Sequence, residues 1–139
     1  MTSCLKEELS TRDARLKAPV RSYSVTARID NKEANNDSEA KGMLKGAYDE
    51  STMVFTYTLS FEGVTPRAIL FKRGARGSAG TLLWKVPEND GGKYKSPVKG
   101  STVLSALQER DLLKGAWFIT IDSESRSPEI RGIITLKQK

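Results

Sequence analysis

Much of the chain alternates between hydrophobic and polar residues with a period of two, which is the pattern of a β-strand that buries one face. The clearest case runs from Phe55 to Phe61, where aromatic and aliphatic residues alternate with threonine and serine. A sheet with one buried and one solvated face has this pattern when its strands are antiparallel. Alternation or short apolar runs predict strands over 22–29, 42–48, 55–61, 68–72, 81–86, 117–121 and 130–136.

One short helix is predicted near 105–114. The Ser105 hydroxyl can cap its first turn, Gln108 stands at the return position of a capping box, and Gly115 can end it. Three leucines are expected to form its buried side: Leu107, Leu112 and Leu113.

Seven or so short strands with one brief, late helix predict an all-β fold. We expect an antiparallel Greek-key β-sandwich or barrel of about seven to eight strands, formed as a single domain by residues 19–139. Residues 1–18 are predicted to be a charged N-terminal arm. The polar segment 30–39 and the glycine- and proline-containing segment 87–100 are predicted to be loops.

Charge and composition narrow the set of partners. The net charge is +6 and the sequence pI is about 9.5, which favours an anionic ligand or, alternatively, serves only solubility. Lys93, Lys95 and Lys99 surround a single aromatic residue, Tyr94, so no specific nucleic-acid module is predicted. No apolar run approaches the ~20 residues of a transmembrane helix. Homo-oligomerisation is left open.

The first residues bear on the compartment. The single cysteine, Cys4, allows no intramolecular disulfide, and the charged N-terminal segment has no apolar core of a signal peptide. The sequence as given therefore predicts a cytoplasmic protein if it is complete. If it is truncated, export or lipid anchoring through Cys4 is the alternative, so the native compartment stays unknown.

The chain contains no histidine, which excludes a Ser–His nucleophile. Three segments nevertheless resemble the chordin-type (CHRD) domain family. Gly63–Gly80 reproduces the family's Thr-Pro turn and its spaced glycines, Gly115–Asp122 its penultimate strand, and Pro128–Ile134 its Glu-Ile-Arg-Gly motif. The hairpin over Ala40–Gly63 agrees as well. The resemblance implies a β-sandwich similar in outline to the copper/zinc superoxide dismutase barrel.

The resemblance also shows where this chain departs from the family. The family's three histidines fall on Leu70, Lys72 and Asp122. Leucine has no donor atom, protonated lysine repels cations, and one carboxylate is insufficient for a transition-metal site. We therefore expect no metal and no other cofactor.

The same positions suggest two readings of a charged pair. If the two strands are neighbours, Lys72 and Asp122 project on one side, with Glu129 and Arg131 nearby. Buried, these four could perform the acid–base chemistry of a cofactor-free isomerase or cyclase. Otherwise Lys72 and Asp122 form only a structural ion pair. Arg131 is expected to bind backbone carbonyls or a carboxylate such as Glu129 or Asp122.

A third candidate is an anion-binding loop. Arg67, Arg73 and Arg76 lie close in sequence to several glycines, so guanidinium groups and free backbone amides could hold an anion or an acidic glycan. The alternative is an exposed loop that arginine makes soluble. Trp84 and Trp117 are expected in the core. The leading interpretation is a non-metallic binding or structural module that contacts a small-molecule or anionic ligand through Gly63–Gly80 and the long loops.

Overall fold

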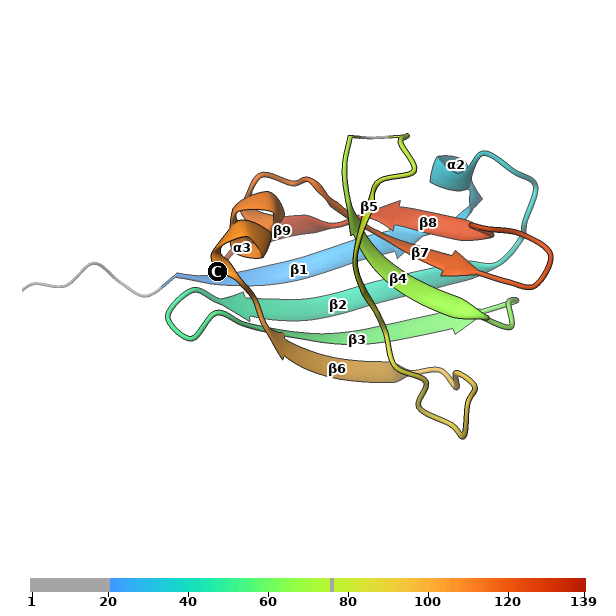
Figure 1. Ribbon diagram of the computed structural model, residues 1–139, viewed down its shortest axis with the longest axis horizontal. Helices are drawn as coiled ribbons and strands as arrows, with labels where there is room; N and C mark the ends of the chain where they lie inside the picture. The colour runs from blue at the N-terminus through green and yellow to red at the C-terminus, as the bar shows by residue number, and fades with distance from the viewer. Residues whose placement is uncertain (1–20, 76) are drawn as a thin grey trace, which may run out of the picture.

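A computed structural model describes residues 21–75 and 77–139. The predicted arm, Cys4 and Arg76 lie outside the described residues. Within them, two antiparallel sheets pack face to face, which confirms the predicted all-β sandwich (Figure 1). The five-stranded sheet has the order β6 (Val98–Val103), β3 (Val54–Glu62), β2 (Lys41–Asp49), β1 (Ser22–Ile29) and β9 (Thr135–Gln138). The four-stranded sheet has the order β5 (Thr81–Lys85), β4 (Ala68–Arg73), β7 (Trp117–Asp122) and β8 (Ile130–Ile133).

The alternating residues fill the space between the sheets, as predicted. Phe55 is fully buried and packs edge-on against Trp117, with 5.7 Å between ring centroids. Trp84 stacks on Phe71 at 4.5 Å, so both tryptophans contribute to the core. These rings anchor the two sheets to each other, because aromatic side chains bury large apolar areas.

Strand β6 lies partly inside the segment predicted as a loop. Its sequence, Val-Lys-Gly-Ser-Thr-Val, has too few apolar residues for its period to be visible. Gly100 pairs with Tyr57, and a Cβ at position 100 would lie 2.3 Å from the Tyr57 hydroxyl oxygen. The strand is thus selected by close packing on a neighbouring ring, which a local pattern does not reveal.

The last predicted strand is two strands, one in each sheet. Between them the Ile134 amide donates to the Trp117 carbonyl at 3.1 Å. Beside this point β8 approaches β1, and Asp30 and Arg131 exchange backbone hydrogen bonds of 3.1 and 3.2 Å. Gly132 permits the approach, since a Cβ there would lie 2.3 Å from the Arg28 carbonyl oxygen. By passing from β8 in one sheet to β9 in the other, the chain closes the edge of the sandwich beside β1.

Helix α3 (Ala106–Leu113) has the predicted capping box between Ser105 and Gln108. Its predicted buried side is wrong in part. Leu112 is fully buried, but Leu107 is 63% exposed and Leu113 40% exposed.

Polar contacts attach α3 to the sheets, since Leu107 and Leu113 are exposed and do not pack in the core. The Tyr48 hydroxyl donates to Glu109 at 2.5 Å, and Arg73 forms an ion pair with Asp111 at 2.7 Å. A second helix, α2 (Asn31–Ala34), is one short turn inside the predicted 30–39 loop and is capped by Asp30. In the described chain, neither helix is long and apolar enough to cross a bilayer.

Candidate functional site

The positions of the family's histidines lie on the outer face of the four-stranded sheet. Lys72 is paired with Phe118, whereas Asp122 is paired with Ala68 at the other end of β4. Paired residues share a face, so Leu70, Lys72 and Asp122 project to the same side. Four register positions, about 13 Å, separate Lys72 from Asp122 along the strands. The predicted juxtaposition is not formed, because antiparallel pairing places the two residues at opposite ends.

These residues do not fit a metal ion. The Leu70 side chain offers no donor atom, and the Lys72 ammonium opposes a cation beside it. Within the described chain, no three cysteine, aspartate or glutamate residues gather as a ligand group. We derive no chemistry through a metal at this position.

Glu129 is engaged in a structural cluster. Hydrogen bonds from Ser123 and Ser38 hold the pKa of its carboxyl below the usual range, and the Ser38 hydroxyl lies 2.6 Å from it. The Asn36 side-chain amide donates to the Glu129 carbonyl at 2.9 Å. These bonds join the loop after α2 to the connection between β7 and β8.

Arg131 fixes the loop between β4 and β5. The side chain is only 5% exposed, its guanidinium lies 4.0 Å over the Phe118 ring, and Nη1 donates to the Ser78 carbonyl at 2.8 Å. Burial lowers the pKa of the guanidinium. The expected bond to a backbone carbonyl is confirmed, and it attaches Ser78 to the sheet.

The predicted arginine cradle is not assembled from Arg67 and Arg73. Arg67 precedes the first residue of β4 and Arg73 is its last residue, so the length of the strand separates them. Arg73 turns to the buried Asp111, and its hydrogen bond lowers the pKa of that carboxyl. Arg76 lies outside the described residues. Arg67 borders a cleft.

That cleft has a volume of about 1030 Å³. The strand connections that line it lie at the end of the sandwich opposite α3 (Figure 1). Three connections surround it: β3–β4 with Arg67, β5–β6, and β7–β8 with Ser123 and Ser125. The charged residues at its surface are Arg67, Lys85, Glu88, Asp90, Lys93, Lys95 and Glu124.

The β5–β6 connection is held in a fixed conformation. The Asn89 side chain accepts from the Lys95 amide and donates to the Lys95 carbonyl, both at 2.8 Å. Tyr94 is 9% exposed and donates to the Val86 carbonyl at 2.5 Å. The buried ring and the Asn89 bonds therefore order the backbone that carries Lys93 and Lys95. In the sequence, the only sign of this ordered loop is the tyrosine between Lys93 and Lys95. That pattern does not indicate that the loop lies beside Arg67.

Positive charge in the cleft is only partly neutralised. Lys85 is 3.5 Å from Glu88, and a bond to the Glu88 backbone amide together with Lys85 lowers the pKa of that carboxyl. Among the described residues, Arg67, Lys93 and Lys95 form no ion pair. Free guanidinium and ammonium groups can hold a carboxylate or phosphate.

The fold and this cleft define a β-sandwich module with an open, loop-lined end. The family model of the CHRD domain matches residues 24–134. The chain therefore belongs to the CHRD domain family, as the motifs of the sequence suggested. A search of curated proteins returns no match.

Proposed function

We propose that this protein is a binding module and that its ligand carries a carboxylate or phosphate group. The proposed ligand site is the cleft bordered by Arg67, Lys93 and Lys95, which we call the loop-end cleft. The observation behind the proposal is the convergence of Arg67, Lys93 and Lys95 on one cleft from two separate connections. Ligand sites favour concave surfaces whose loops are positioned by a rigid scaffold.

The fixed loop backbone supports the same proposal. Asn89 and Tyr94 order the β5–β6 connection before any ligand arrives. Less conformational entropy is then lost on binding, which increases affinity for a given set of contacts. No metal takes part in this proposal.

Calorimetric titration with citrate and with inorganic phosphate tests it. Replacing Arg67 or Lys93 by glutamate should each weaken binding by about tenfold, because a hydrogen-bonded charge is lost and a like charge is added. Lys114→Glu, an exposed change at the opposite end, is the matched control and should bind as wild type. Equal binding by wild type, Arg67→Glu and Lys93→Glu would contradict the proposal.

The alternative activity, a cofactor-free isomerase or cyclase, gains no support from the geometry. Lys72 and Asp122 are about 13 Å apart along their strands. Glu129 is engaged with serines and Arg131 with Phe118 and Ser78. None of these four residues lines the cleft beside Arg67 or the two hollows along β1 and β2. We therefore do not propose that activity.

A further inference from the structure

The outer face of the five-stranded sheet carries an unusual run of side chains. Two neighbouring rows cross all five strands at right angles to the chain direction. The first row is Thr135, Thr26, Lys45, Thr58 and Lys99, and the second is Lys137, Ser24, Ala47, Thr56 and Ser101. We call these ten residues the hydroxyl–lysine face. It contains six hydroxyl side chains, three lysines and no acidic residue.

The three lysines of this face are unneutralised. Among the described residues, Lys45, Lys99 and Lys137 form no ion pair, and each is exposed. Lys45 and Lys99 are two strands apart in one row, which separates their backbones by about 9–10 Å. The face therefore presents positive charges at intervals on a flat surface, with hydroxyl groups between them.

A groove adjoins the first row. Thr26, Lys45 and Thr135 form one wall of a hollow of about 530 Å³, which Arg28 and Met43 also line. Arg28 and Met43 are shared with a second hollow of about 280 Å³.

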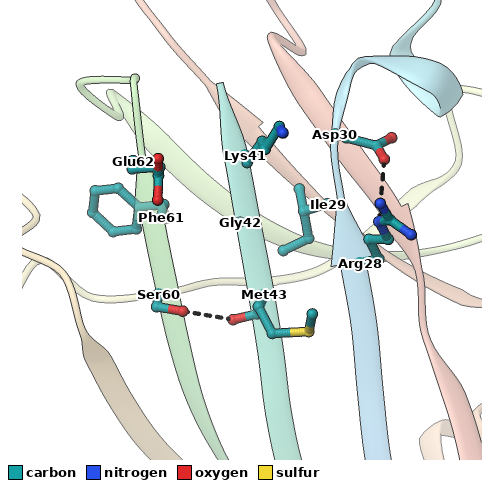
Figure 2. A pocket seen from close by; sticks show the side chains of 9 residues that line it. All are labelled: Arg28, Ile29, Asp30, Lys41, Gly42, Met43, Ser60, Phe61 and Glu62. Atoms are coloured by element: carbon teal, nitrogen blue, oxygen red, sulfur yellow. Dashed lines mark hydrogen bonds and ion pairs between the residues drawn. The ribbon is translucent and has the colours of Figure 1, made fainter. Parts of the chain in front are cut away.

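Figure 2 shows this second hollow, which extends over β1, β2 and β3. Arg28 lies 3.9 Å from Asp30 there, and the Ser60 hydroxyl donates to the Met43 carbonyl at 3.4 Å. Lys41 is paired with Glu62 across β2 and β3. Acidic residues line both hollows: Asp30 and Glu33 the first, and Asp30 and Glu62 the second. In the first hollow, which adjoins the face, the cations Arg28, Lys32 and Lys45 outnumber these two carboxylates.

We propose that the hydroxyl–lysine face and its groove bind a linear acidic polysaccharide. An extended polymer fits a flat face that crosses five strands, and its repeated carboxylate or sulfate groups match lysines placed at intervals. Serine and threonine hydroxyls can donate to and accept from sugar hydroxyls between the charges. The surface is separate from the loop-end cleft, so the proposal goes beyond the function proposed above.

The same side chains disfavour two other anionic partners. Single-stranded nucleic acids stack their bases on aromatic side chains, and neither row contains an aromatic residue. Insertion at a membrane interface uses large apolar side chains. The only apolar member of the rows is Ala47; beside them Met43 is 38% exposed and Val103 is 67% exposed.

Affinity chromatography and calorimetry with heparin and with polygalacturonate test this inference on the full chain. A variant with Lys45, Lys99 and Lys137 changed to glutamine should elute from both columns at lower salt and bind roughly tenfold or more weakly. Thr26→Ala with Thr58→Ala should also weaken polygalacturonate binding, because direct hydrogen bonds to the sugar are lost. All these side chains lie on a solvated sheet face, and thermal unfolding of each variant verifies the fold. The single change Lys45→Gln serves as a milder probe.

A control and a comparison variant separate this surface from the cleft. Lys114→Gln removes one charge elsewhere and should leave retention on both columns unchanged. Lys93→Gln changes the loop-end cleft and should reduce retention less than the triple variant does. Retention lost with Lys93→Gln but kept by the triple variant would assign the polymer to the loop-end cleft and overturn the inference. Equal losses of binding to polygalacturonate, single-stranded DNA and phosphatidylserine vesicles would also overturn it, because they would show unspecific charge attraction.

Discussion

Gly132 lies where β8 crosses β1, and its missing side chain lets the two backbones meet. A Cβ at this position would lie 2.3 Å from the Arg28 carbonyl oxygen. Because that oxygen belongs to the backbone, the β1 or β8 backbone would have to move to relieve the clash. Gly132→Ala should lower the free energy of unfolding by about 2 kcal/mol or more, measured by urea denaturation. Gly42→Ala is the matched control, since its nearest backbone oxygen, that of Ser60, is 3.1 Å away. Equal losses in the two variants would contradict this role of Gly132.

The Arg73–Asp111 pair makes stability depend on pH. The arginine lowers the pKa of the buried carboxyl, so the pair stabilises the fold fully above the unfolded-state pKa of about 4. The stabilisation is lost as the pH falls through the lower, folded-state pKa. Asp111→Asn should cost about 2 kcal/mol near neutral pH, and the difference from wild type should shrink below about pH 4. Thermal unfolding across this range checks it, with Glu39→Gln, at an exposed residue, as control. A difference independent of pH would rule out the ionised pair as its cause.

Among the elements, helix α3 has a start that its own sequence specifies and a buried side that its tertiary contacts determine. Ser105 and Gln108 specify its start, but only Leu112 of the three leucines is buried. Leu112→Ala should therefore lower the free energy of unfolding by about 2–4 kcal/mol, whereas Leu107→Ala should change it by less than about 0.5 kcal/mol. Chemical denaturation of both variants measures this, and similar losses would mean that Leu107 packs against the core.

The elements also show which parts of a fold are legible in one sequence. The strand over 55–61 was predictable because each inward residue is apolar and each outward one is polar. Strand β6 was not, since its Gly100 is chosen by the ring of Tyr57 rather than by a local pattern. The helix orientation was missed because Tyr48 and Arg73, far away in the chain, supply polar contacts that replace two apolar ones.

At the scale of the whole molecule, strand register decides the candidate site. The sequence placed Leu70, Lys72 and Asp122 on one face, and the register confirms that they share it. Their separation depends on how β4 and β7 are aligned, which no periodicity encodes. The cleft could not be predicted for a related reason: Arg67 and Lys93 line one cleft only because the connections between different strands converge at one end.

The two proposed surfaces use different basic residues of the molecule. Small anions are assigned to the loop-end cleft, and linear acidic polymers to the hydroxyl–lysine face. The family's histidine positions, with Leu70 and Lys72 on a sheet partly covered by the Arg131-bound loop, belong to neither surface.

Amide chemical shifts of the ¹⁵N-labelled protein during a citrate titration test the central claim most directly. We expect saturable shifts at Arg67, Lys93, Lys95 and Ser123, and in Arg67→Glu these shifts should need about tenfold more citrate, with the rest of the spectrum unchanged. Saturable shifts confined to Leu70, Lys72 and Asp122, or no saturable shift at any residue, would contradict the assignment of the ligand site to the loop-end cleft.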